Sequence, residues 1–331
     1  MSVPGAPPAS TRPPRSSAVG AGPVAAVDCG TNSTRLLVVG DGRQLVRLMR
    51  ITRLGQGVDS TGVLDAAAIA RTVLVLEEYR GLLDRHGVRA IRMAATSAVR
   101  DAANGAEFLD AASHAIGAPA ELLSGEEEGR LAFAGATSDL PSSDEVRVVV
   151  DIGGGSTELI AGTGRAVGVA SLDVGCVRLT EKFLHHDPPL PEELASCDEL
   201  VSLELDRAAR TVPALEDDGR PGRQLIGLAG TVSTLAMLDQ GLAEYDWGRV
   251  HHSVLELAGV ERWCATLIAE PSSSRARRPG MVEGREDVIA AGVVVLREVM
   301  RRFGFSRCLV SETDILDGLA ASLEGAPGSA R

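Results

Sequence analysis

Asp28 and Asp151 hold the same place in a segment that occurs twice in this chain. The segment Val27–Leu36 (VDCGTNSTRL) returns as Val150–Leu159 (VDIGGGSTEL), with six of ten positions identical at an offset of 123 residues. A single turn aspartate is usually a structural cap. Two in matching context favour a function, because a carboxylate at a strand end can hold a divalent cation through oxygen ligands.

The turns that follow these two aspartates carry the candidate phosphate ligands, because Gly-rich turns present backbone N–H groups and hydroxyls to anions. In chain order they are Gly30, Thr31, Asn32, Ser33, Gly153, Gly154, Gly155, Ser156 and Thr157. The hydroxyls could equally bond their own backbone, and the glycines could serve only a positive φ. A triple glycine is entropically costly, so close approach of a ligand is the favoured interpretation.

Glu158 breaks the symmetry of the two copies, since the first copy has Arg35 at the matching position. This additional carboxylate indicates a further role in the second copy, on a metal site shared with Asp28 and Asp151. Oxygen ligands of this kind suit a hard divalent cation such as Mg²⁺.

Three consecutive carboxylates, Glu126, Glu127 and Glu128, follow Ser124 at the start of a predicted helix. Acids there complement the helix dipole and complete a capping box with Ser124. One acid suffices for capping, and three crowded carboxylates repel each other. The alternative is that one of them is a general base beside a bound phosphate.

Ser97 and Arg100 form another candidate phosphate contact, since they follow an apolar strand and a guanidinium can donate two parallel hydrogen bonds. Arg130, Arg178 and the turn Gly230–Thr231 are further candidates for substrate contact.

Other basic residues favour a structural interpretation. Arg275, Arg277 and Arg278 predict a solvated loop, with the grip of a long anion as the alternative. The adjacent pairs His185–His186 and His251–His252 argue against a histidine metal site, because adjacency does not place both side chains on one face.

Composition excludes several classes of function. A net charge of −12 and a pI near 5.1 argue against a general nucleic-acid binder, although a local Arg cluster can still bind a polyanion. The five cysteines form no CxxC pair, which favours a reducing cytoplasm. The longest strongly apolar run, 288–296, is too short for a membrane span.

Hydrophobic periodicity predicts an alternation of strands and helices. After the first duplicated segment we expect helix 65–86, strand 88–96, helix 104–117 opened by a capping box of Asn104 and Glu107, strand 120–123 and helix 124–136. After the second we expect three strands over 146–172, helices 177–184 and 191–212, strand 224–228, a helix to 238, helices 256–268 and 286–302, strand 308–310 and helix 315–323.

The domain plan follows from this repetition. We expect a Pro-rich disordered tail over 1–23, a first lobe over 24–138, a second lobe over 139–312 and a disordered end over 325–331. The last helix, within 313–324, is expected to pack back on the first lobe. A charged, Gly- and Pro-containing loop is expected over 216–223.

The chain resembles the exopolyphosphatase and guanosine pentaphosphate phosphohydrolase family of the actin-like ATPase superfamily. The matching segments stand in family order: VDCGTNSTRL, AATSAVRDA, LLSGEEEGRL, VVVDIGGGSTEL, SLDVGCVRLTEKF and LIGLAGTVSTLA. The chain departs at Cys29 and Thr31, where Ile and Ser are commoner, and in its length it resembles the short two-domain members. Longer members carry a further helical region that helps to hold long substrates.

The resemblance implies two actin-like, ribonuclease H-like α/β lobes, each on a mixed five-stranded sheet, with the site in the cleft between them. It implies that Glu128 is the catalytic base, that Mg²⁺ or another divalent cation is needed, and that K⁺ is an additional candidate. The implied substrate is inorganic polyphosphate, with guanosine pentaphosphate as the alternative, and the implied assembly is a cytoplasmic homodimer. An actin-like kinase or nucleotide switch would share the two phosphate turns.

Overall fold

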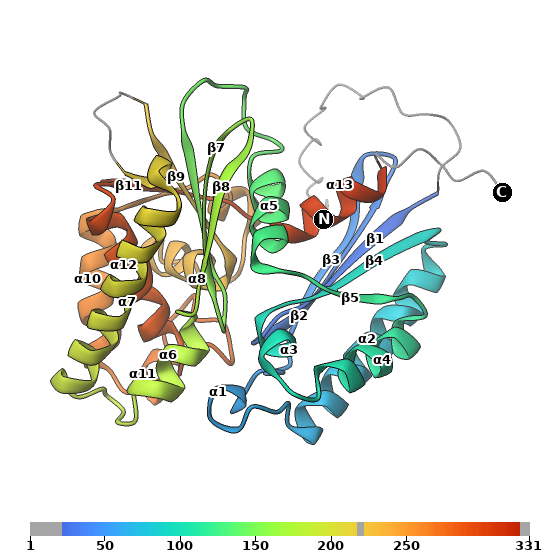
Figure 1. Cartoon of the computed structure of the whole chain (residues 1–331), viewed down its shortest axis with the longest axis horizontal. Coiled ribbons are helices and arrows are strands. Elements are labelled where there is room, and N and C mark those ends of the chain that lie inside the picture. The colour runs from blue at the N-terminus through green and yellow to red at the C-terminus, as the bar shows by residue number, and fades with distance from the viewer. Residues whose placement is uncertain (1–21, 217–221, 325–331) are drawn as a thin grey trace, which may run out of the picture.

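The computed structural model describes residues 22–216 and 222–324. The expected tail lies outside the described residues except for Gly22 and Pro23, as do the expected end over 325–331 and most of the loop over 216–223. Within the described ranges the chain forms two α/β lobes, each built on one mixed sheet (Figure 1). The fold class predicted from the sequence is confirmed.

The first sheet has the strand order β3-β2-β1-β4-β5. Its strands are β1 (Val24–Cys29), β2 (Ser33–Gly40), β3 (Arg43–Ile51), β4 (Ala90–Ala95) and β5 (Ala120–Leu122). Helices α2 (Ala66–Arg85) and α4 (Gly105–Ile116) cover one face, where Leu76, Tyr79 and Phe108 are fully buried. β1 is buried along its whole length, as a central strand covered on both faces must be.

The second sheet repeats this order and adds one strand, β10-β11-β9-β6-β7-β8. Its strands are β6 (Arg147–Ile152), β7 (Thr157–Thr163), β8 (Arg165–Leu172), β9 (Gln224–Leu228), β10 (Val254–Glu256) and β11 (Arg307–Val310). The expectation of five strands is therefore wrong for this lobe. β10 is a three-residue edge strand, antiparallel to β11, and is too short to show any period in the sequence.

Five helices surround the second sheet: α6 (Cys176–Phe183), α7 (Pro191–Thr211), α8 (Ala229–Asp239), α10 (Leu257–Ala269) and α12 (Ile289–Arg302). The shorter elements are α1 (Val58–Thr61), α3 (Ser97–Asp101), the 3₁₀ helix Pro213–Leu215, α9 (Trp247–Val250) and α11 (Ser272–Arg275). Among the described residues, no helix combines the length and the apolar character that a membrane crossing requires.

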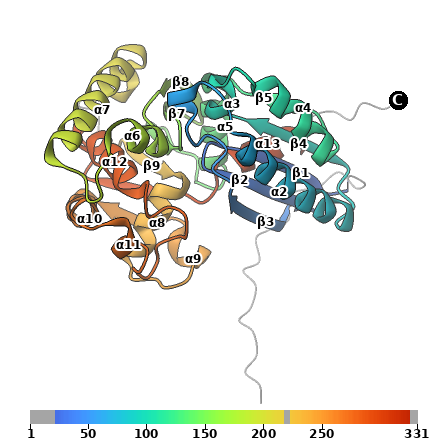
Figure 2. The same cartoon turned by 90° about the horizontal axis from the view of Figure 1, so that it is seen from below.

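Helices α5 (Gly125–Ala136) and α13 (Ile315–Glu324) lie between the two sheets (Figures 1 and 2). They cross in backbone contact, because a Cβ on Gly135 would lie 1.8 Å from the Asp314 carbonyl oxygen and one on Gly318 would lie 2.2 Å from that of Leu131. α13 packs on β1 and on α5, while α5 also packs on β7 and β8. The division of the chain into domains at 138 and 312 stays a prediction.

The predicted capping boxes form only in part. The Asn104 side chain makes no cap; it accepts from the Leu64 N–H at 2.8 Å and donates to the Leu64 carbonyl at 3.0 Å. Ser124 does cap α5 by accepting from the Glu127 N–H at 3.2 Å, but the Glu127 carboxylate turns to Arg92 at 2.9 Å. Both departures arise because a partner distant in the sequence competes for the capping side chain.

Candidate active site

The two copies of the repeated segment fold alike. The Gly30 N–H donates to the Ser33 carbonyl at 3.0 Å, and the Gly153 N–H donates to the Ser156 carbonyl at the same distance. Each turn joins two antiparallel strands, β1 to β2 and β6 to β7. The same local sequence therefore gives the same tight turn at the cleft edge of both sheets.

The cross-strand partners of the two aspartates are where the copies differ. Asp28 stands opposite Arg35, and Asp151 stands opposite Glu158. Arg35 donates from Nε and Nη2 to one oxygen of Asp28 at 2.9 and 2.7 Å. The first aspartate is thus paired with a cation, whereas the second faces another carboxylate.

The glycines of the second turn are needed because the lobes approach each other there. A Cβ on Gly154 would lie 2.8 Å from the Thr31 Cβ, and one on Gly155 would lie 2.5 Å from the Ser97 Oγ. Neither glycine has a positive φ, so the alternative explanation by backbone conformation is wrong for this pair. Thr31 and Ser97 hydrogen-bond each other at 3.0 Å, and this links two predicted phosphate contacts.

A cleft cavity of about 510 Å³ lies over both turns. Twelve of the predicted site residues line it: Asp28, Gly30, Thr31, Asn32, Ser33, Ser97, Glu128, Asp151, Gly153, Gly154, Ser156 and Gly230. The structure thus brings together residues that are up to 202 positions apart in the sequence, from Asp28 to Gly230.

α5 holds Glu128 at this cleft, and its glycines explain how. A Cβ on Gly125 would lie 2.5 Å from Ser171 of β8, and one on Gly129 would lie 2.6 Å from Val169. Because both positions are glycine, the helix packs directly on the second sheet, and Glu128 is only 9% exposed. Glu126 instead pairs on the surface with Arg130, so the three carboxylates are not crowded in one place.

Asp28, Glu128, Asp151 and Glu158 have raised pKa values, as does Glu312 farther along the cleft. Burial, then Glu158, Asp151 and Asp28, raise the pKa of Glu128 well above its usual range. Burial and the neighbouring Glu158 raise the pKa of Asp151 to about 8, and burial raises that of Glu158 to about 7. Burial also raises the pKa of Asp28, against the opposing effect of Arg35.

The donor set fits a divalent cation. One oxygen of Asp28 and one of Glu128 are buried without a hydrogen-bond partner among the described residues. Buried carboxylates in such number are costly unless a positive charge compensates them. Hard oxygen donors of this kind are the ligands that Mg²⁺ prefers.

The three arginines predicted to contact the substrate do not line the cavity. Arg100 lies 3.6 Å from the Glu128 carboxylate and donates to the Leu123 carbonyl, and Arg130 is paired with Glu126 on the surface. Arg178 is held by Asp59, Asp101 and the Gly155 carbonyl. As Asp59 and Asp101 belong to the first lobe, Arg178 connects the lobes, and each of its three side-chain nitrogens already donates one hydrogen bond.

Four other predicted contacts lie behind the cavity wall. The Thr157 hydroxyl bonds the Val174 carbonyl, and Thr231 packs against Gly292 of α12. Glu158 is buried and accepts from the Ser171 hydroxyl at 2.8 Å. Gly155 is covered by Thr31 and Ser97, as described above. These residues support the turns and the carboxylate cluster from behind.

Two of the three arginines in the basic segment 272–280 are already paired. Arg275 is buried; it donates to Asp187 at 2.7 Å and to the Glu286 carbonyl at 2.6 Å. Arg278 donates to Glu270 at 2.7 Å. The expected solvated loop instead contains the short helix α11. Asp187, 88 residues away, neutralises Arg275, and the nearby Glu270 neutralises Arg278.

Sequence reasoning missed the other half of the cleft. Its lining includes Arg35, Arg47, Met49, Met237, Tyr245, Trp247, Val282, Arg285, Glu312 and Asp314. Arg285 is buried and donates to the Met49 sulfur at 3.4 Å. One signal was present, since the chain has only two Trp and two Tyr, and Tyr245 and Trp247 stand two residues apart.

Comparison with known proteins extends these findings. The chain matches the Ppx/GppA phosphatase family over residues 38–325. It is 43% identical over 319 residues to "Exopolyphosphatase 2" of Mycobacterium tuberculosis, a match that spans 91% of this chain and 98% of that protein. A bifunctional 3-dehydroquinate synthase/phosphatase of Fusobacterium nucleatum is 30% identical over 315 residues, which are 91% of this chain and 46% of that protein.

Solved structures agree with the sequence relatives. A protein described as exopolyphosphatase-like superposes with a TM-score of 0.86 at 34% identity, over 91% of this chain and 98% of its own. The Ppx/GppA family member of Aquifex aeolicus gives a TM-score of 0.76 at 33% identity, over 93% of this chain and 99% of its own.

The duplicated turns, the carboxylate-rich cleft and these relatives together place the chain among hydrolases of phosphoanhydrides. The chain belongs, more closely, to the Ppx/GppA phosphatase family.

Proposed function

We propose that this protein is an exopolyphosphatase, which hydrolyses the terminal phosphoanhydride of inorganic polyphosphate. The observation that carries the proposal is the buried Glu128 carboxylate, with one unpartnered oxygen, in a cleft that two Gly-rich turns also line. The identity of 43% to a protein named Exopolyphosphatase 2 supports the same substrate class.

The reaction follows from the groups in the cleft. Backbone N–H groups and hydroxyls of the turns at Thr31 and Gly154 hold the terminal phosphoryl group. Glu128 accepts a proton from a water molecule, whose oxygen attacks the terminal phosphorus in line with the leaving oxygen. The anhydride P–O bond breaks, orthophosphate forms, and the proton passes to the end of the shortened chain.

The residues that would hold a divalent cation are Asp28, Asp151 and Glu158, with Glu158 acting from behind the cavity wall. When bound, Mg²⁺ would supply positive charge that offsets the charge developing on the phosphates. K⁺ as a second cation and a homodimer remain predictions from the family resemblance. A reducing cytoplasm is supported by five buried cysteines without disulfides.

One observation favours a second substrate, guanosine pentaphosphate. A linear phosphate chain has no apolar surface, yet the cleft continues past the turns to Met49, Met237, Tyr245 and Trp247. An apolar and aromatic wall with a few polar groups suits a nucleoside ring. Arg285, buried in the same half, offers a cation for a further phosphate.

The substrate class can be tested by measuring orthophosphate release from polyphosphates of several lengths, guanosine pentaphosphate and ATP in parallel, with and without Mg²⁺. We expect Mg²⁺-dependent release from polyphosphate, with short chains cleaved at a kcat/KM at least equal to that of long chains. The cleft is small and Arg275 and Arg278 are already paired, so distant phosphates find few contacts. Partial digests should therefore show a ladder of intermediates.

Three other outcomes of these assays would favour a different substrate, reaction or chain-length preference. Guanosine pentaphosphate cleaved with a higher kcat/KM than any polyphosphate would make the second substrate the main one. Phosphate transfer from ATP to an added acceptor, without release from polyphosphate, would indicate the kinase alternative. Long chains that vanish without intermediates would contradict the predicted preference for short chains.

A further inference from the structure

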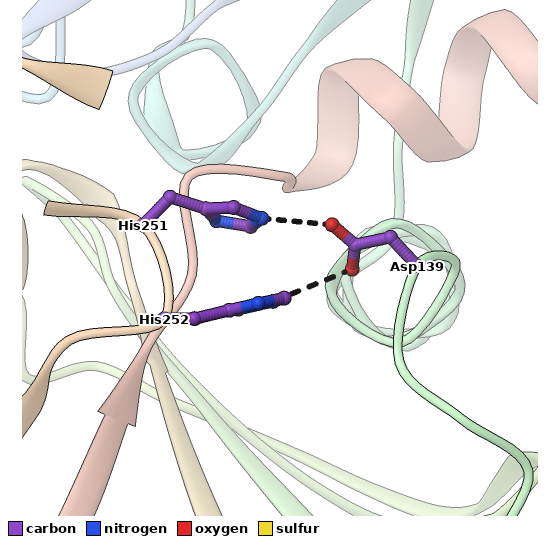
Figure 3. A group of neighbouring side chains, drawn as sticks. All are labelled: Asp139, His251 and His252. Carbon is purple, nitrogen blue, oxygen red and sulfur yellow. Dashed lines mark hydrogen bonds and ion pairs between the residues drawn. The ribbon is translucent and has the colours of Figure 1, made fainter. Parts of the chain in front are cut away.

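His251 and His252 lie together with Asp139 at the rim between the lobes (Figure 3). The two imidazole rings stack with centroids 3.8 Å apart, so the expectation that adjacent histidines point to different faces is wrong here. The reason is the backbone of His252, whose φ of 63° lies in the left-handed region. A non-glycine residue in that region is strained and persists only where surrounding contacts impose it.

The hydrogen bonds of His251 fix its protonation. Its Nδ1 accepts from the Glu312 backbone N–H at 3.0 Å, and its Nε2 lies 2.8 Å from Oδ2 of Asp139. Both contacts are satisfied when the ring is neutral with its single proton on Nε2. A metal ion on Nε2 would require that proton on Nδ1, where it would oppose the Glu312 N–H. The cluster therefore fits a hydrogen-bonded link between two chain segments better than a metal site.

The two segments that His251 links lead to the helices that form the cleft. Asp139 follows α5, the helix that carries Glu128, and Glu312 precedes α13. These two helices lie between the sheets and cross at Gly135 and Gly318. The His251 imidazole therefore bonds both segments that run between the lobes, one at Asp139 and the other at Glu312.

The same ring also contacts the wall of the cleft. The ring of Trp247, which lines the cavity, has its centroid 4.7 Å from that of His251. The Glu312 carboxylate, attached to the backbone that His251 holds, accepts from the Tyr245 hydroxyl at 2.7 Å. The Arg47 guanidinium covers Trp247 at 5.4 Å from the ring centroid.

We propose that His251 is a positioning residue: its Nδ1 fixes the Glu312–Trp247 wall of the cleft, while its Nε2 anchors the linker at Asp139. The first contact sets substrate affinity and the second sets only stability. The activity part of this proposal rests on the proposed function, whereas its spectroscopic part does not.

The test uses paired substitutions that keep one contact each, in a Trp263→Phe background that leaves Trp247 as the only tryptophan. His251→Asn places an amide oxygen near the Nδ1 position, and His251→Gln reaches the Nε2 position. Asp139→Ala removes the linker contact to His251, together with the 3.6 Å contact between Asp139 and His252, and keeps the Nδ1 bond. The measurements are Trp247 fluorescence, Tm, and kcat and KM for tripolyphosphate.

We expect His251→Gln and His251→Ala to shift the Trp247 emission and to raise KM about fivefold at nearly constant kcat, as loss of one hydrogen bond would do. His251→Asn should restore both values towards wild type. Asp139→Ala should lower Tm without moving the emission or KM. Equal changes in KM for Asp139→Ala and His251→Gln, or no emission change in any variant, would overturn the proposal.

Failure of the proposed function is distinguishable, because it would abolish the kinetic readout and leave the fluorescence comparison intact. A Zn²⁺ titration of Tm completes the test. Wild type and His252→Gly should respond alike. A Zn²⁺-dependent stabilisation that His252→Gly loses would show a metal site, which contradicts the protonation assigned to His251.

Discussion

Glu128→Gln is expected to lower kcat on polyphosphate by about 100-fold or more, because a positioned general base contributes roughly 10²–10⁴-fold. KM should change little, since the turns and not Glu128 hold the terminal phosphoryl group. The substitution keeps the shape of the side chain in its tightly packed place on α5. Steady-state orthophosphate release, with circular dichroism to confirm the fold, measures the effect.

The neighbouring acids provide matched controls on the same helix turn. Glu126→Gln removes a surface ion pair with Arg130, and Glu127→Gln removes one with Arg92. Exposed pairs of this kind contribute little, so both variants should retain most of the activity. A Glu128→Gln enzyme that works as well as these controls would show that the base is another group.

Asp151→Asn should lower activity about tenfold or more at limiting Mg²⁺, and added Mg²⁺ should restore part of it. Asp151 lies buried among other carboxyl groups and stands opposite Glu158. Burial and Glu158 raise the pKa of Asp151 to about 8, so this carboxyl group is costly to bury in its ionised form, and the metal-free Asn variant should be at least as stable as wild type. Binding to the folded state raises Tm, so the Mg²⁺-dependent rise in Tm should become smaller.

The control for this variant is Asp110→Asn, which changes an exposed acid on α4 and should alter neither property. Asp28→Asn is expected to behave differently from Asp151→Asn in stability. It leaves the half-buried Arg35 with one carboxylate partner fewer, so Tm should fall. An activity loss in Asp151→Asn that no Mg²⁺ concentration relieves, with the metal-dependent Tm rise intact, would contradict the metal role.

The predictable part of the site is the part encoded locally. Asp28 and Asp151 were found because identical short sequences fold into identical strand–turn–strand units, and the duplication marked them. Glu128 was one of three candidate acids at a predicted helix start, and only the family resemblance singled it out as the base. The strands and long helices were likewise readable from hydrophobic period, as α2 (Ala66–Arg85) shows.

The remainder depends on contacts between distant segments. Arg178 follows the second lobe's phosphate turn and suggested a substrate contact, but Asp59 and Asp101, 119 and 77 residues away, use its donors. Arg35 and Asp314 meet across 279 residues and help to place Asp28. Nothing in the local sequence indicates which arginine finds an acid in the other lobe and which, like Arg285, forms no ion pair within residues 22–216 and 222–324.

Hydrolysis at the chain end is tested most directly by the fate of solvent oxygen. Polyphosphate of defined length would be hydrolysed in H₂¹⁸O under conditions in which each chain loses at most one phosphate, and the products would be analysed by mass spectrometry. Attack of a Glu128-activated water on the terminal phosphorus predicts one ¹⁸O in each released orthophosphate and none in the shortened chain. Unlabelled orthophosphate with label in the chain, or labelled internal fragments, would contradict the proposed hydrolysis at the chain end.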